Sequence, residues 1–319
     1  MFLRLIGAEL NRLRRRRAIL ALVGFAILVP ATIAAMRIHG TAPRDAEARS
    51  EVLAVHAVDI DRCMADPLLY GLRGAPSRAD CEEAVVQMRD PRRVLDLARE
   101  RHGDGYGVLT ALLVALTLLG AAAARRDRSG ATLPEQSPTA PDRFDLWSAT
   151  AAATGVIALV VASAVSTGFW VALWAAARSR GLDVEENALR PALAYGMRGA
   201  LFTVAAAVGA YALTELTRSV AATVAIVLGL GAAASVLPAV LGLSDRWTPI
   251  PNLDAIVAGS SVYDTGYDPD CVVPASVSPR SACPASDDLT AGQGVGYFGL
   301  PLLLVGTASA VAFARRRDS

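Results

Sequence analysis

The chain has 319 residues, of which 53% are hydrophobic, 6% aromatic and 19% charged, and its mean hydropathy is +0.39. A soluble domain of this length carries more charge and spreads its apolar residues at helix or strand periods. Here they gather into long uncharged blocks, as a bilayer core requires. The formal net charge of +1 argues against a nucleic-acid partner.

Residues 1–17 predict an amphipathic cytoplasmic helix. Phe2, Ile6, Leu10 and Leu13 recur at helical spacing, and arginines occupy the other faces. Such a helix lies along the lipid headgroups with its arginines toward anionic lipid. The alternative is that this segment simply extends the first membrane span inward.

Six uncharged apolar blocks then predict six transmembrane helices. The third block is long enough to be tilted or to project from the bilayer, and the fourth is short and can borrow from residues 195–198. The blocks are residues 18–36, 107–124, 148–177, 199–214, 219–243 and 295–314.

The arginines predict the orientation, because basic residues beside short loops favour the cytoplasm. Every one of the 31 basic residues is an arginine, a usage typical of high-GC bacteria. The arginines of segments 1–17, 125–147, 215–218 and 315–319 all fall on one side of a six-span layout. We therefore expect a multi-pass protein of the bacterial inner membrane with both termini in the cytoplasm. The short connection 178–198 disagrees, since it carries four arginines on the outer side: Arg178, Arg180, Arg190 and Arg198.

The first outer segment, residues 37–106, predicts a small helical domain with helices at 46–65 and 78–101. Cys63 and Cys81 lie in it, and Cys271 and Cys283 lie in the last outer segment, 244–294. Disulfides persist outside the cytoplasm, and pairing within each segment is the simplest of three arrangements. Free thiols are the alternative.

The last outer segment differs in kind from the first. Residues 252–258 form an apolar stretch too short to span, which could dip into the membrane or lie on its outer face. The rest is rich in Gly, Pro, Ser and Asp and predicts an irregular loop fastened by the Cys271–Cys283 pair. The expected fold class is thus an all-α polytopic membrane protein.

Catalytic patterns are missing from the chain. There is no P-loop, no HExxH and no nucleophile with a base near the bilayer, and His39, His56 and His102 match no zinc spacing. Glu215 and Arg218 predict a helix-end ion pair rather than a proton relay. We expect no metal site and no enzymatic activity in this chain. Small residues four apart favour close helix packing: Gly229/Ala233, Gly231/Ser235 and Thr203/Ala207.

Three local patterns resemble one family. They are Asp127-Arg-Ser-Gly130-Ala-Thr132-Leu133 followed by Pro141-Asp142-Arg143, the turn Leu216-Thr-Arg-Ser-Val-Ala-Ala222, and the ending Phe313-Ala-Arg-Arg-Arg317-Asp318. With the six-span layout, they resemble the type-2 ABC transporter permeases of the actinobacterial kind. The resemblance covers nearly the whole chain.

This resemblance implies an exporter that works by alternating access. A separate ATPase subunit would bind ATP and Mg, and a second permease copy or a sister chain would complete the pathway. The ATPase would dock on the cytoplasmic segment 130–143, where Thr132 and Thr139 each read as a helix start. The residues expected to couple to it are Asp127, Gly130, Thr132, Leu133, Pro134, Glu135, Pro141, Asp142 and Arg143.

Two other functions remain open from the sequence. One is a membrane scaffold or sensor that acts through the outer helical domain. The other is a membrane enzyme of an unrecognised type, which would depend on polar residues such as Asp254, Glu215 or the histidines.

Overall fold

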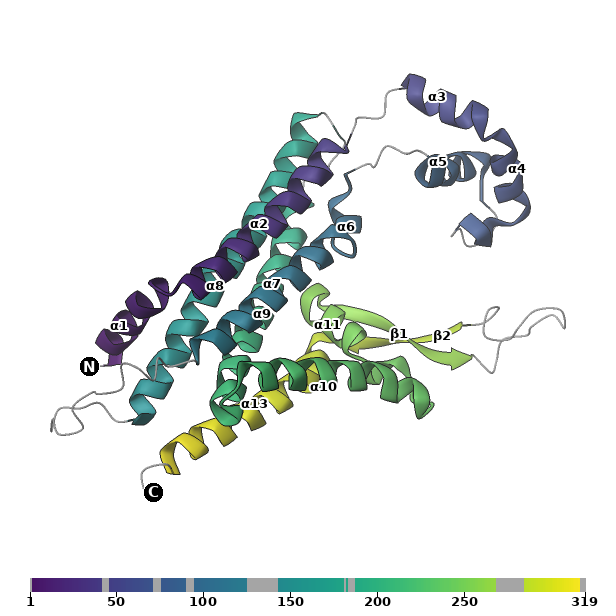
Figure 1. The fold of residues 1–319 in the computed structure, drawn as a ribbon. Helices are drawn as coiled ribbons and strands as arrows, with labels where there is room; N and C mark the ends of the chain where they lie inside the picture. The colour runs from purple at the N-terminus through teal and green to yellow at the C-terminus, as the bar shows by residue number, and fades with distance from the viewer. Residues whose placement is uncertain are drawn as a thin grey trace.

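The computed structural model describes residues 2–41, 46–70, 76–89, 95–124, 143–180, 182, 187–267 and 284–315. Within these residues, six helices are long and apolar enough to cross a membrane, which matches the predicted number. Figure 1 shows them tilted in a common direction except α10, which diverges from the rest. The six are α2 (Arg17–His39), α7 (Asp104–Ala123), α8 (Arg143–Ser179), α9 (Leu189–Thr217), α10 (Val220–Val240) and α13 (Ala291–Arg315).

Two of these helices, α8 and α9, exceed the predicted spans by the most. The 37 residues of α8 begin at Arg143 and extend over about 55 Å, well beyond a hydrocarbon core of about 30 Å. Helix α9 begins at Leu189, ten residues before the predicted start at residue 199. Arg190 and Arg198 interrupted the apolar pattern there, but they lie in the first turns of α9, where a helix can project from the membrane.

The N-terminal helix α1 (Phe2–Arg14) is separate from α2. Arg16 between them has an extended backbone with φ −83° and ψ 121°, so α1 is not an inward extension of the first span. Leu13 is 1% exposed and packs in one cluster with Leu116 and Leu119 of α7. The apolar face of α1 therefore packs against the bundle.

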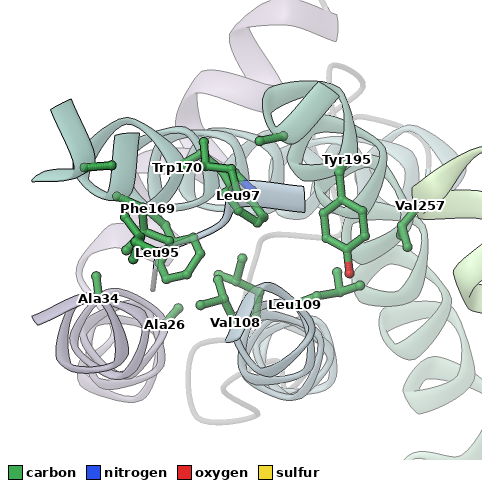
Figure 2. Packing of buried hydrophobic residues seen from close by; sticks show 14 of the residues in the cluster. Ala26, Ala34, Leu95, Leu97, Val108, Leu109, Phe169, Trp170, Tyr195 and Val257 are labelled. Carbon is green, nitrogen blue, oxygen red and sulfur yellow. The ribbon is translucent and has the colours of Figure 1, made fainter. Parts of the chain in front are cut away.

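The core lies among α2, α7, α8 and α9. Figure 2 shows Phe169 and Trp170 of α8 packed over Val108 of α7, with Tyr195 of α9 alongside. Burial differs sharply between spans: half of the apolar window is buried in the helices ending at Ala123 and Thr217, but only 6% in α10 and α13. The bundle thus consists of a packed block, formed by α2, α7, α8 and α9, with α10 and α13 at its periphery.

The predicted helical domain between the first two spans is present (Figure 1). It comprises α3 (Ala46–Val55), α4 (Ala57–Ala65), η1 (Pro67–Tyr70) and α5 (Arg78–Arg89), and α6 (Leu97–Glu100) leads back into α7. The Cys63–Cys81 disulfide joins α4 to α5, as predicted. Ile60, Val85 and the disulfide form its buried centre, so the domain has a small core of its own.

The all-α expectation is wrong in the last connection. Strands β1 (Ser260–Tyr267) and β2 (Pro284–Thr290) pair antiparallel, from Ser260 opposite Thr290 to Tyr267 opposite Pro284, with an irregularity between Asp264 and Gly266. Val262 is 64% exposed whereas Tyr263 is 7% exposed, the alternation expected of a strand with one covered face. The turn-forming composition of this segment concealed that alternation.

Helix α11 (Pro249–Ala258) follows the short helix η3 (Asp245–Trp247) and supports the strand pair. At about 15 Å it cannot span a bilayer, as predicted from its length. Leu253 and Val257 are buried with residues of α7 and α9, and Ala255 packs against Tyr263 and Leu289 of the strands. The stretch is therefore a packed helix, held at its start by Asn252, whose amide donates to the carbonyls of Arg246 and Thr248.

Candidate functional site at the two ends of the bundle

Most of the predicted coupling residues lie outside the described residues. This applies to Asp127, Gly130, Thr132, Leu133, Pro134, Glu135, Pro141 and Asp142. Arg143 is the first residue of α8 rather than part of a connection. The structure does describe the helix ends on either side of this segment, and these lie at the end of the bundle near both chain termini, here called the terminal end (Figure 1).

The C-terminal end of α7 is tied to the N-terminal region. Arg16 donates from Nη1 to the carbonyl oxygen of Ala122 at 3.4 Å. That carbonyl is among the last of α7, where the helix end carries partial negative charge, so a cation is favourable there. The end of α7 is thereby coupled to the corner between α1 and α2.

The N-terminal end of α8 is tied to α9 through aromatic side chains. Phe144 and Trp147 stack with ring centres 6.0 Å apart, and Trp147 lies 6.0 Å from Tyr211. The Tyr211 hydroxyl donates to the carbonyl oxygen of Trp147 at 3.3 Å, and the Tyr211 side chain is fully buried. The two helix ends that flank residues 125–142 in the chain are therefore both attached to the packed block.

The tight turn from α9 to α10 is held by hydroxyl groups. Ser219 caps α10 by accepting from the Ala222 amide at 3.2 Å, and the hydroxyl of Thr223 lies 2.9 Å from that of Thr214 and 3.0 Å from that of Thr217. Thr217, Ser219 and Ala222 fall in the sequence pattern 216–222, and Thr214 and Thr223 flank it.

Arg218 directly follows α9, and its backbone lies in the left-handed region with φ 56°. Its side chain is exposed, while Glu215 is partly buried. The ion pair between Glu215 and Arg218 stays a prediction.

At the opposite end of the bundle, a buried ion-pair cluster links α2 to α6 and α7. Arg37 contacts the Glu100 carboxylate through Nη2, and its Nε lies 3.4 Å from Asp104. The side chains of Arg37 and Glu100 are 9% and 5% exposed. A charged pair this deeply buried persists only because each partner compensates the other. In the sequence, the cluster is indicated only by Arg37 directly after the first predicted span and by Glu100 and Asp104 shortly before the second.

Beside this cluster lies a second polar group, around Asp254 of α11. Burial raises the pKa of the Asp254 carboxyl, and the nearby His102 partly opposes that shift. Tyr195 is 3% exposed, and no hydrogen-bond partner for its hydroxyl exists among the described residues. Figure 2 shows that hydroxyl pointing from α9 toward Leu109 and the side of Val257. The structure thus places Asp254 and His102 within electrostatic reach of each other. Both are among the polar residues on which a membrane enzyme would depend.

The arginines that disagreed with the orientation rule have local roles. Arg178 lies over the Trp174 ring at 5.1 Å, and Arg180 donates to the carbonyl of Thr41 at the end of α2. The Arg198 guanidinium packs against Gly259, whose φ of +103° ends α11. Arg180 and Arg198 therefore join separate elements at this end of the bundle, whereas Arg178 stacks on a residue of its own helix.

The three histidines lie in different segments of the chain. His56 pairs with Asp59 at 3.3 Å in the small domain. Over the part of the chain that the structure describes, no group of three or more His, Cys, Asp or Glu could hold a metal ion. Cys271 and Cys283 lie outside that part, so their pairing stays a prediction.

No family model, curated protein or solved structure matches this chain. The class that the fold defines is a helical protein with six apolar helices of membrane-spanning length.

Proposed function

We propose that the chain is the permease subunit of an ATP-binding cassette exporter in a bacterial inner membrane, with both termini in the cytoplasm. A separate ATPase would bind ATP and Mg, and a second copy of this chain or a sister permease would complete the pathway. The motifs at segment 125–143 and at the turn into α10 support this proposal. Its substrate stays open.

One structural observation carries the proposal. Segment 125–142 joins two ends that both belong to the packed block, through Arg16 with Ala122 and through Trp147 with Tyr211. In α10 only Thr223 and Pro238 are buried, so this helix is weakly attached to that block. A subunit that docks on the segment could move the block as one body relative to α10, which is the motion alternating access needs.

The test is a complex with a candidate ATPase encoded beside this chain. Co-expression should give a stable complex whose ATPase rate falls severalfold when residues 130–143 are scrambled at constant composition. The matched control is R78Q/E82Q, which alters an exposed ion pair of the small domain and should leave the rate unchanged. An unchanged complex and rate after scrambling would contradict the proposal.

The scaffold or sensor function keeps one observation in its favour. The small domain has its own disulfide and core, and its helices α3 and α4 expose Val55 and Val58 at 72% and 71%. Apolar side chains this exposed outside a span favour a protein partner. In that case deleting residues 46–89 would abolish function, and the intact protein would function normally without any ATPase.

A further inference from the structure

A basic pocket lies at the corner between α1 and α2. It has a volume of about 410 Å³ and is lined by Ala8, Asn11, Arg12, Arg15 and Arg16. Glu9 pairs with Arg12 at 3.3 Å, so three arginines and one carboxylate together carry a net positive charge. Guanidinium groups recognise phosphate oxygens through paired N–H donors, which makes an oxyanion the fitting ligand.

The start of α2 adds to this preference. Arg16 precedes the helix with an extended backbone, no side chain caps the N-terminus, and the first turn contains no acidic residue. The first N–H groups of this 23-residue helix have no partner within the helix and carry partial positive charge. An anion at this corner is favoured by both the pocket's arginines and the helix end.

The surroundings indicate where the anion comes from. Because α2 is a candidate span, its first turn lies at the level of the lipid headgroups. Leu3 of α1 is 81% exposed and Leu20 of α2 is 53% exposed, so both helices expose apolar surface. A soluble phosphate compound would leave that apolar surface uncovered, whereas acyl chains would cover it.

We propose that this corner is a binding site for the headgroup of an anionic phospholipid. Arg12, Arg15 and Arg16 donate to the phosphate oxygens, and the acyl chains lie along the exposed apolar side chains of α1 and α2. Arg16 also contacts the Ala122 carbonyl, so a bound lipid would adjoin the end of α7. Binding does not depend on the proposed transporter function.

The experiment measures lipid binding to the full-length protein in a non-ionic detergent by native mass spectrometry. Phosphatidylglycerol is the probe, and phosphatidylcholine and inorganic phosphate are the comparisons. R12Q/R15Q removes two pocket arginines, and R4Q/R14Q removes the same charge from α1 outside the pocket. We expect phosphatidylglycerol binding to weaken about tenfold or more in R12Q/R15Q and by less than about twofold in R4Q/R14Q.

A charge-preserving variant, R12K/R15K, guards against loss of folding and should bind phosphatidylglycerol more weakly than the wild type but more tightly than R12Q/R15Q, because lysine keeps the charge and lacks the paired donors. Equal weakening in both glutamine pairs would show general surface attraction and would overturn the proposal. Wild-type binding in R12Q/R15Q would also overturn it. Displacement of phosphatidylglycerol by an equal concentration of inorganic phosphate would assign the pocket to free phosphate instead of lipid.

Discussion

The carbonyl oxygen of Ala207 lies where a Cβ on Gly120 would have to be, so α7 and α9 meet backbone against backbone. Ala207 and Thr203 are fully buried at this contact. The sequence predicted close packing for the pair Thr203/Ala207 of α9 and for the pairs Gly229/Ala233 and Gly231/Ser235 of α10. Within the described residues, a Cβ added to Gly229 or Gly231 would have nothing within 4 Å, so only the α9 pair packs inside the chain.

G120A should therefore destabilise the bundle. Because the obstacle is backbone, it cannot rotate away, and overpacking of this kind costs about 1–3 kcal/mol or more. G231A is the control, since it adds the same methyl group in open space and should leave the free energy of unfolding unchanged or slightly higher. Thermal unfolding of both variants in detergent measures the difference. Equal melting temperatures for the two would contradict the close contact of α7 with α9.

The buried pair of Arg37 and Glu100 predicts a strong and non-additive effect. R37Q or E100Q alone leaves a buried charge without its partner, which costs about 3–5 kcal/mol. R37Q/E100Q should lose less than the sum of the two, and a double-mutant cycle on unfolding measures the coupling. The exposed pair Arg78 and Glu82, with side chains 67% and 32% exposed, should show coupling of less than about 1 kcal/mol. Additive effects at Arg37 and Glu100 would show that the pair is not formed.

The Cys63–Cys81 disulfide should stabilise the small domain rather than the bundle. It closes a loop with a sequence separation of 18, for which the loss of unfolded-chain entropy corresponds to about 3 kcal/mol. In C63S/C81S, limited proteolysis should cleave within residues 46–89 much faster. Cleavage within α7 to α9 should keep its wild-type rate, and a matching acceleration there would mean that the domain and bundle unfold together.

The small domain should also lose stability in acid. Burial tends to raise the pKa of Asp59, but Arg89 at 2.9 Å and His56 at 3.3 Å outweigh it, so the pKa lies below its ordinary value. Hydrogen bonds from Ser77 likewise lower the pKa of Asp80. The unfolded chain then takes up protons first, so this stabilisation is complete above about pH 4 and is lost as the pH falls through the folded pKa values.

Hydrogen exchange of residues 46–89 between pH 3 and 6, corrected for intrinsic rates, measures this loss. D59N should be less protected at pH 6 and should show a smaller change on acidification than the wild type. D61N, on the same helix with an exposed side chain, should behave like the wild type. If D59N keeps the full wild-type dependence on pH, the contacts of Asp59 with Arg89 and His56 do not stabilise the domain.

The sequence was most informative where one physical requirement dominates. A span must be apolar over about 20 residues, so the number of spans could be read directly. The Cys63–Cys81 pair followed from its confinement to one segment. The β1–β2 pair was missed because Gly, Pro and Asp masked the alternation of Val262 and Tyr263, and strand pairing depends on partners that are distant in the sequence, up to Thr290 for Ser260.

Candidate site residues were harder to predict for the same reason. The ion pair of Arg37 with Glu100 and the electrostatic interaction of His102 with Asp254 join residues that are far apart in the chain, and no local spacing reveals them. Arg190 and Arg198 misled the prediction of α9, because charge in a sequence does not distinguish a loop from a helix end that projects from the bilayer. Local motifs at segment 125–143 remain the basis of the proposed coupling.

Orientation in the membrane decides the functional proposals. ATPase docking requires the terminal end of the bundle to face the cytoplasm, and the disulfide requires the opposite end to face outside. Single cysteines at Arg14 and Ser179, both exposed, report on the two ends. They are introduced into a C271S/C283S background that keeps the Cys63–Cys81 bond.

Labelling of intact cells with a membrane-impermeant maleimide is the most direct measurement. S179C should be labelled in intact cells, and R14C should be labelled only after the membrane is permeabilised. The reverse pattern, or equal labelling of both in intact cells, would contradict the six-span arrangement with cytoplasmic termini and the transporter proposal with it.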